Sequence, residues 1–450
     1  MLCKTAATAS RFQGAFRFPS YSCHMTWGGR RPSPLVIAAL MSAALGAASL
    51  ELPSGPTYDP YAWLVWGREI AHFDLSTASS GTSWKPLPSL IDALLSPLGD
   101  SLPGAWLAIA RGGAIFAVFM AARLAWRLSP HRFRGLAAAT TSVSLVLTHE
   151  WLRRNGVGDA EGLMTALGLL AVDRHLDGRQ GQAFACLVLA GLVRVEMWPF
   201  CLLYGAWLWL RGRLRLRIAL GLAALPVLWL GGDWVGSGHL TTAAGRARHP
   251  IAHSPGASAR PVLGVLGEAF GMLPLPAWIA LGAALLVALV RRRGLALTIA
   301  ACAAAWTAIV AVMAAKGYPG LPRFLFMASA LEAVLAGIGC ACVAAALARN
   351  RRGAAMAATG LVCAAFGFGA VDDARRLPAD VAAVDRVADV DAALADSVDD
   401  AGGARTVLRC GVPVTRWYTV TALAWDLDVG PGRVRAEAAS VRTGGCPALS

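Results

Sequence analysis

The stretch YDPYAWLVWGREIAHFDLSTASSGTSWKPLP, residues 58–88, follows an apolar run at residues 34–51 that is long enough to enter a membrane. It places Asp59, Arg68 and Glu69 close to that run. Charge beside a membrane is costly to place and usually has a specific role. We therefore expect residues 58–88 to form a functional loop at one membrane surface.

The amino-acid composition indicates a membrane protein. Of the 450 residues, 56% are hydrophobic and 15% are charged, and the apolar residues fall in repeated long runs. A segment in lipid must satisfy its own backbone hydrogen bonds, so only helices or a closed barrel can span a bilayer. The runs do not alternate as barrel strands do. The predicted fold class is therefore an all-α polytopic membrane protein.

The net charge of +14 does not indicate nucleic-acid binding, because the basic residues gather in short clusters between apolar runs. These clusters lie at residues 131–134, 174–179, 211–217, 291–293 and 349–352. Such a distribution is typical of cytoplasmic loops. We expect an integral protein of the plasma membrane, with a cytoplasmic N-terminal tail at residues 1–33 and an uncleaved first span. Met25 is a plausible start, since residues 1–24 show no periodic pattern.

Placing every basic cluster inside the cell predicts about eleven spans within a transmembrane domain of residues 34–371. The spans are expected near residues 34–51, 104–127, 135–148, 160–174, 183–194, 197–210, 218–232, 275–290, 294–314, 324–348 and 354–371. The outer loops are then residues 52–103, 149–159, 233–274 and 315–323, and the C-terminus is extracytoplasmic.

The region from Ala183 to Leu210 lies between two basic clusters, so it must cross the membrane twice or not at all. Each half would be a helix of roughly 16–21 Å, shorter than the ~30 Å hydrocarbon core. The turn at Arg194 and Glu196 would then lie at membrane depth. A polar turn at that depth is tolerated where it lines protein or water, which predicts a wet cavity open to the exterior.

Residues 372–450 differ in composition and predict a small extracytoplasmic α/β appendage. A helical pattern covers residues 381–398, and β-like runs follow at residues 406–409 and 415–420. If this segment faces an oxidising exterior, Cys410 and Cys446 could form a disulfide, and the sequence favours neither outcome.

In the first outer loop, Asp59 and Lys85 each stand at a junction between loop and helix. We expect both to serve a function at the same membrane surface. The aromatic residues between them, Tyr61, Trp63 and Trp66, are of the kind that settles at a bilayer interface, so an interfacial helix is the simpler prediction for these three.

Two later outer loops carry further charges. Asp159 and Glu161 begin a span, where helix capping is an equally good account of their carboxylates. Arg323 stands where the chain enters a helix, and its guanidinium can bind phosphate oxygens in bidentate fashion. The position of Lys316 in the same loop is explained by a long side chain that snorkels to the membrane surface. The sequence has no P-loop, dinucleotide fingerprint, H-E-x-x-H motif or paired C-x-x-C. No metal site is predicted, although Asp159 and Glu161 could share a loosely held divalent ion.

This arrangement resembles the polytopic glycosyltransferases of the GT-C superfamily. Asp59 follows the first span, and W-K-P-L-P at residues 84–88 is similar to the K-P-P-L or H-P-P-L element of the aminoarabinose and protein-mannosyl transferase branches. Further motifs resemble landmarks of actinobacterial members, namely G-D-A-E-G-L at 158–163, D-R-H-L at 173–176, R-V-E-M-W-P-F at 194–200 and L-P-R-F at 321–324. The resemblance covers roughly residues 34–370.

The resemblance implies an inverting glycosyltransferase that moves a sugar, hexose or pentose, from a polyprenyl-phosphate donor to a glycan, lipid or protein of the envelope. It makes Asp59 the candidate base, with Asp159 or Glu161 second. The resemblance also makes three cations the candidates for holding the leaving phosphate, namely Lys85, Arg323 and Arg194. Tyr58, Trp84 and Glu196 are expected to line the cavity. Arg194 and Glu196 could equally form a structural ion pair.

Two other classes of function stay open. Charged residues at a broken intramembrane helix also occur in transporters and lipid flippases, which often contain inverted repeats. No such repeat is visible in this sequence. A non-catalytic envelope scaffold is the third alternative, in which residues 372–450 would do the binding and the membrane part would only anchor them.

Overall fold

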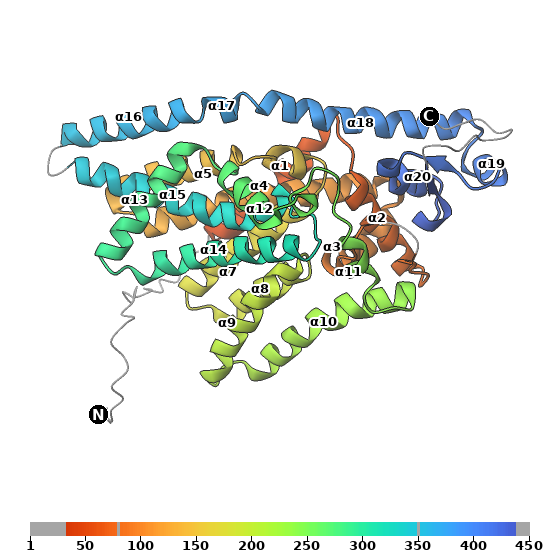
Figure 1. Ribbon diagram of the computed structural model, residues 1–450, viewed down its shortest axis with the longest axis horizontal. Helices are drawn as coiled ribbons and strands as arrows, with labels where there is room; N and C mark the ends of the chain where they lie inside the picture. Colours follow the sequence, from red (N-terminus) through yellow and green to blue (C-terminus); the bar gives the residue numbers. More distant parts are fainter. Residues whose placement is uncertain (1–32, 79–81, 349–351, 438–450) are drawn as a thin grey trace, which may run out of the picture.

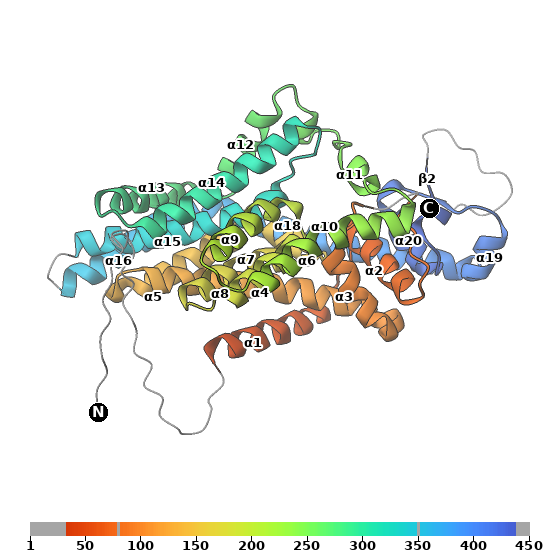
Figure 2. The same ribbon diagram turned by 90° about the horizontal axis from the view of Figure 1, so that it is seen from below.

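A computed structural model describes residues 33–78, 82–348 and 352–437, and nearly all regular structure in it is helical (Figure 1, Figure 2). The helices of the main bundle are α1 (Pro34–Ala48), α4 (Leu102–Leu128), α5 (Arg134–Val146), α7 (Glu161–Leu176), α8 (Gln180–Gly191), α9 (Trp198–Leu210), α10 (Arg215–Ser237), α13 (Leu275–Val290), α14 (Gly294–Ala315) and α15 (Phe326–Leu347). Shorter helices in the connecting loops are α2 (Tyr58–Ala71), α3 (Pro86–Leu95), α6 (Trp151–Gly156), α11 (Thr242–Ala247) and α12 (Pro261–Gly271).

Helix α15 lies at the centre of the bundle and is buried along most of its length. It packs against α13, α5, α14 and α4. Its sequence is rich in Ala, Gly and Cys, and such small side chains let neighbouring helices approach closely. At Gly339 the backbone of α13 comes so near that an added methyl group would overlap the carbonyl oxygen of Ala280. Tight packing of small residues therefore holds the bundle together.

Each of the eleven predicted spans contains a helix, but the helices differ greatly in length. Among the described residues, five are long and apolar enough to cross a membrane, or seven if two bent helix pairs each count as one span. Helices α5, α7, α8 and α9 have only 13, 16, 12 and 13 residues. The chain is an integral membrane protein, and the number of complete crossings stays a prediction.

The region 183–210 has the predicted form of two short helices that meet at a turn. Helix α8 ends at Gly191, a 3₁₀ turn covers Val195–Met197, and α9 begins at Trp198. Arg194 and Glu196 in this turn are both buried. The wet cavity predicted around them stays a prediction.

The C-terminal part of the chain begins with α16 (Arg352–Gly369), α17 (Val371–Ala374) and α18 (Leu377–Asp400), which run along one long side of the molecule (Figure 1). They lead to α19 (Ala404–Arg409) and α20 (Val420–Asp426) beside α2. Two strands of two residues each, β1 (Val414–Thr415) and β2 (Arg435–Ala436), pair in parallel. Helices α16 to α18 thus connect the far end of the bundle to α2.

The β-like runs predicted in the C-terminal segment are wrong for the most part. Residues 406–409 lie in helix α19, and of residues 415–420 only Thr415 is in a strand. Val420 starts α20, which is buried against α2, so tertiary packing overrides the β propensity of this Thr- and Val-rich stretch. The possible disulfide partner Cys446 lies outside the described residues.

The prediction that the aromatic residues of α2 lie at a bilayer interface is also wrong. Tyr61 is 7% exposed, and Trp63 and Trp66 are fully buried. Helix α2 lies between α3 on one side and α20 on another, so protein rather than lipid covers its apolar surface. Helix α2 is therefore a core element of its end of the molecule.

The close contact between α13 and α15 predicts a strong effect of a single methyl group. We expect Gly339→Ala to lower the midpoint of thermal unfolding in detergent, because the overlap with Ala280 forces the helices apart at a cost of about 1–3 kcal/mol. Gly282→Ala in α13 is the matched control, since its added methyl group would meet no described atom within 4 Å. Equal midpoints for the two variants would contradict this account of the core.

Candidate functional site

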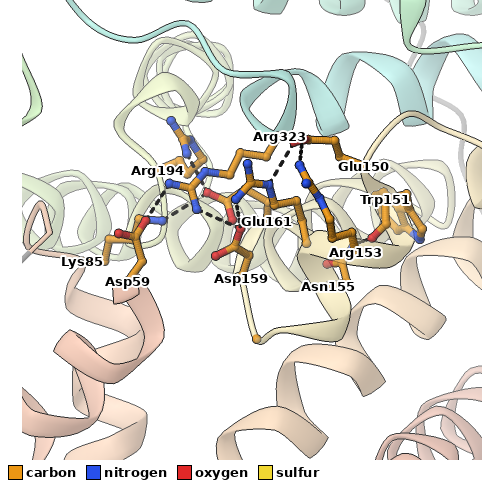
Figure 3. Close-up of polar contacts among 12 residues, drawn as sticks. Asp59, Lys85, Glu150, Trp151, Arg153, Asn155, Asp159, Glu161, Arg194 and Arg323 are labelled. Atoms are coloured by element: carbon orange, nitrogen blue, oxygen red, sulfur yellow. Dashed lines mark hydrogen bonds and ion pairs between the residues drawn. The ribbon is translucent and has the colours of Figure 1, made fainter. Parts of the chain in front are cut away.

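Charged side chains from five separate segments meet near the N-terminal end of α2 (Figure 3). We call them the charged cluster: Asp59, Lys85, Asp159, Glu161, Arg194, Glu196 and Arg323. Asp59 lies in the first turn of α2, Lys85 directly precedes α3, and Arg323 lies in a 3₁₀ turn before α15. The structure thus brings together all the charged residues to which the sequence analysis assigned a catalytic or phosphate-binding role.

Prolines set the backbone at two of these positions. Lys85 precedes Pro86, and a residue before proline is pushed out of the helical region. Lys85 accordingly has an extended conformation, with φ −132° and ψ 108°, and its side chain leaves the helix axis before α3 begins. Leu321 precedes Pro322 in the same way, which places Arg323 in a separate short turn. The W-K-P-L-P and L-P-R-F motifs therefore position cations.

Arg323 connects two carboxylates from different parts of the chain. Its Nη2 donates to Oδ2 of Asp59 at 2.6 Å, and its Nη1 donates to Oδ2 of Asp159 at 2.8 Å. The Nε of Arg323 is buried and has no hydrogen-bond partner among the described residues. A planar guanidinium suits such a bridge because its donors point in fixed directions. One side chain thus joins the loop after the first span to the loop before α7.

Glu161 organises the other half of the charged cluster. Its Oε1 accepts from Nζ of Lys85 at 3.2 Å and from Nη1 of Arg194 at 2.7 Å. Arg194 also donates to both carboxylate oxygens of Glu196, at 2.5 and 3.1 Å. Arg194 and Glu196 therefore do form an ion pair, the alternative that the sequence had left open. This pair fixes the turn between α8 and α9.

Burial and neighbouring charges act differently on the two aspartates bound to Arg323. Burial alone would raise the pKa of Asp59, but the charges of Arg323 and Lys85 outweigh burial and hold that pKa below its ordinary value. For Asp159, burial and the nearby carboxylate of Glu161 raise the pKa above its ordinary value in spite of Arg323. Asp59 is thus held as a carboxylate, while Asp159 binds a proton more readily.

Aromatic rings support the cations of the charged cluster. Nζ of Lys85 lies 4.5 Å from the ring centre of Trp63, and the guanidinium of Arg194 lies 3.8 Å from that of Phe324. Such contacts stabilise a cation away from water. The contacts of Trp63 and Phe324 with these cations were not predicted from the sequence. The signal was present, because Trp63 follows Asp59 by four residues and so shares one face of α2 with it.

The other predicted site residues take supporting positions. Trp84 packs against Trp66, with ring centres 5.8 Å apart, and donates its indole N–H to the carbonyl of Leu228 in α10. Tyr58 is half-buried and lies 6.1 Å, between ring centres, from Trp417. The N-cap of α7 is Ala160, and no side chain makes a capping bond there, but Glu161 lies in the first turn of α7, where the helix dipole favours a carboxylate.

A further charge that the sequence analysis did not assign to the site is Arg154. Its Nη1 lies 4.0 Å from Oδ2 of Asp159, and its Nε donates to Glu150 at 2.9 Å. Glu150 also pairs with Arg153 (Figure 3). These residues on and before α6 form an outer shell of charge next to the cluster.

The C-terminal segment holds α2 at several points along its length. Thr421 in α20 donates to the carbonyl of Tyr58 at 2.8 Å, and the hydroxyl of Tyr61 donates to Asp391 in α18 at 3.1 Å. At the other end, Arg68 pairs with Asp428 at 2.8 Å and donates to the carbonyl of Trp425 at 3.3 Å. Because Asp59 lies in the first turn of α2, the C-terminal segment positions a residue of the charged cluster.

The carboxylates of the cluster that could have held a metal ion are paired with cationic side chains. In residues 33–78, 82–348 and 352–437, no three His, Cys, Asp or Glu side chains gather as metal ligands. Asp159 and Glu161, which could have shared a divalent ion, are instead paired with Arg323, Lys85 and Arg194.

Comparison with models of known protein families finds no match, and neither does comparison with curated proteins. Among solved structures, the chain is similar to ArnT from Cupriavidus metallidurans in the apo state, with a TM-score of 0.53, 16% identity, and 88% of this chain and 84% of that one covered.

Two further solved structures are similar to this chain. For ArnT from Cupriavidus metallidurans bound to undecaprenyl phosphate, the TM-score is 0.49 at 15% identity, covering 89% of this chain and 88% of that one. For the oligosaccharyltransferase of Archaeoglobus fulgidus, the TM-score is 0.40 at 13% identity, covering 89% of this chain and 62% of that one. The likeness to apo ArnT shows that the chain shares the fold of that structure, in line with the resemblance noted from its motifs.

The contact between Tyr61 and Asp391 predicts a pH-dependent stability. Burial and the nearby Asp426 raise the pKa of Asp391 to about 7. As pH rises from about 4 to 7, the unfolded chain loses this proton before the folded one does, so the residue increasingly destabilises the folded state. Asp391→Asn stays neutral and can still accept from Tyr61. We expect it to raise the thermal midpoint in detergent by about 1–3 °C more at pH 8 than at pH 5.5.

Asp396→Asn is the control for this measurement, because Asp396 is exposed on the same helix. The effect of Asp396→Asn on the thermal midpoint should be the same at both pH values. A gain from Asp391→Asn that does not depend on pH would show that the buried carboxylate is not the cause.

Proposed function

We propose that this protein is an inverting glycosyltransferase that moves a sugar from a polyprenyl-phosphate donor to an acceptor of the cell envelope at the outer face of the membrane. The observation that carries the proposal is the charged cluster, in which buried carboxylates and cations from distant loops meet at the end of α2. The GT-C fold supports the reaction class, since glycosyl transfer needs a base for the acceptor and cations for a phosphate leaving group.

Lys85 and Arg323 are the best candidates to bind the donor phosphate. An ammonium group has three N–H donors, and the only side-chain acceptor of Lys85 among the described residues is Glu161. Arg323 has a buried Nε without a partner in the same part of the chain. Arg194 is less available, because Glu161 and Glu196 already occupy its donors. We assign Arg194 to holding Glu161 in place.

Asp59 is the candidate general base. In the reaction, the acceptor hydroxyl oxygen attacks the anomeric carbon, the bond from that carbon to the phosphate oxygen breaks, and polyprenyl phosphate departs with its electron pair. The hydroxyl proton goes to Asp59, and attack from the opposite side inverts the configuration. A positioned carboxylate typically contributes about 10²- to 10⁴-fold to the rate of such a step.

Arg323 couples donor binding to the activation of this base. In the structure it bonds to Asp59 and lowers the pKa of that carboxyl, which makes the carboxylate a weaker base. A donor phosphate competes for the same guanidinium, because phosphate oxygens also accept from both Nη atoms. When the phosphate draws Arg323 away, the pKa of Asp59 rises towards its ordinary value. The base therefore becomes effective only when donor is bound.

We predict that Asp59→Asn lowers sugar transfer by at least about 100-fold, while donor binding and thermal stability stay near those of the wild type. The asparagine oxygen can still accept from Arg323 but cannot take a proton. Transfer is measured in membranes from a radiolabelled polyprenyl-phosphate sugar.

The control for Asp59→Asn is Asp74→Asn, which changes an exposed residue of the same loop. Full turnover by Asp59→Asn would rule out its role, and movement of the labelled lipid across the bilayer without transfer would favour a flippase.

For Arg323 we predict a loss of donor affinity. Arg323→Lys keeps the charge between Asp59 and Asp159 but loses the bidentate geometry. We expect binding of undecaprenyl phosphate in detergent to weaken by about tenfold, which corresponds to one lost charge-assisted hydrogen bond. Lys316→Gln changes the charge of the same loop at an exposed position and should leave the affinity unchanged. An unaltered affinity for Arg323→Lys would contradict the assignment.

A further inference from the structure

A second polar site lies away from the charged cluster, at the opposite end of α10. A pocket of about 990 Å³ opens between the N-terminal ends of α8 and α10. Three arginines line it, Arg179, Arg213 and Arg217, together with apolar residues that include Phe184, Val188 and Leu214. The turns before α8 and α10 supply Arg179 and Arg213, so the basic groups gather at one end of the pocket.

The position of α10 places this pocket at the membrane surface opposite the charged cluster. Helix α10 has 23 residues, about 35 Å in length, and is one of the helices able to span a bilayer. Its N-terminal end forms the pocket, while its C-terminal half contacts the first outer loop through Leu228 with Trp84 and Gly236 with Thr77. In Figure 1, α8, α9 and α10 lie on the side away from α16 to α18.

The positive charge of this pocket is not neutralised by carboxylates. Arg213 donates to Gln180 at 3.3 Å, and Arg179 and Arg217 have no ion-pair partner within the described ranges. The nearest acidic residue along the chain, Asp177, is paired with Arg127 and Arg174 instead. The N-terminus of α8, a helix of twelve residues, adds further positive potential. The basic end of the pocket therefore suits an anion.

The remaining wall of the pocket suits an acyl chain. Phe184, Leu208 and Ile218 form a small hydrophobic cluster that joins α8, α9 and α10, and Val188 and Leu214 pack against it. Leu189, which also lines the pocket, is 39% exposed. A free phosphate or a nucleotide would leave this apolar wall uncovered, whereas a lipid would cover it and place its headgroup among the arginines.

We propose that the pocket between α8 and α10 binds an anionic phospholipid, with its phosphate at Arg179, Arg213 and Arg217 and an acyl chain along α8. Basic pockets between transmembrane helices on the cytoplasmic side are known to suit anionic headgroups. Assignment to the inner leaflet rests on the proposed function, which puts the charged cluster outside. Binding itself does not depend on that function. The bound lipid would fix the ends of α8 and α10, and so the Arg194 turn at the other end of α8.

The test is native mass spectrometry of the full chain, purified in detergent and titrated with phosphatidylglycerol or, in parallel, phosphatidylcholine. We expect the wild type to bind phosphatidylglycerol at least about tenfold more tightly, and the variant R179Q/R213Q/R217Q to lose that preference. The matched control R291Q/R292Q/R293Q removes another basic cluster that does not line the pocket. It should bind phosphatidylglycerol as the wild type does.

A second variant tests the apolar part without removing charge. Ala185 lines the pocket, so Ala185→Trp fills it and should weaken phosphatidylglycerol binding, while 10 mM inorganic phosphate should not displace the lipid. Three results would overturn the proposal: equal losses in the two triple variants, unchanged binding by Ala185→Trp, or displacement by phosphate alone. Because these readouts measure binding only, they are independent of any failure of sugar transfer.

Discussion

The arrangement of charges around the first turn of α2 depends on one guanidinium. Arg323 joins Asp59 from the loop after the first span to Asp159 from the loop before α7, and both bonds are shorter than 3 Å. Without that cation, the carboxylates of Asp59 and Asp159 would lie near each other and near Glu161 with less positive charge to compensate them, which is unfavourable. The ion pair therefore has a structural role and, under the proposed function, a chemical one as well. The residue that closes the site is also the one that a phosphate would compete for.

The contacts of the C-terminal segment with α2 bear on the alternative of a non-catalytic scaffold. If residues 372–450 were a separate binding module, the membrane part would be independent of them. Instead, α20 and α18 contact α2 at Tyr58 and Tyr61, directly beside Asp59. Loss of the segment would expose the buried aromatic residues of α2 and release the helix. The charged cluster and the C-terminal segment are thus physically coupled, so deleting the segment would disturb the cluster as well and could not by itself separate an enzyme from a scaffold.

Much of the helical fold could be predicted from sequence because long apolar runs admit few alternatives in lipid. The convergence of Asp59, Lys85 and Arg323 could also be predicted, since prolines and loop junctions mark each of them. Their partners could not, because pairing depends on the packing of helices far apart in the chain. The same limit explains the errors at α2 and α20. An aromatic face looks identical in sequence whether lipid or protein covers it, and a Thr- and Val-rich stretch becomes a helix when its neighbour α2 offers a matching surface.

The shortness of α8 and α9 has a consequence for the lipid around the protein. At 12 and 13 residues, each helix reaches only about 18–20 Å, against about 30 Å for the hydrocarbon layer. Leu202, Leu203 and Leu210 of α9 are exposed, so this helix presents an apolar surface to its surroundings. A bilayer meets so short an apolar surface by thinning. Headgroups beside α8 and α9 would then sit deeper than elsewhere, and a lipid-borne phosphate would have less distance to travel before reaching Lys85.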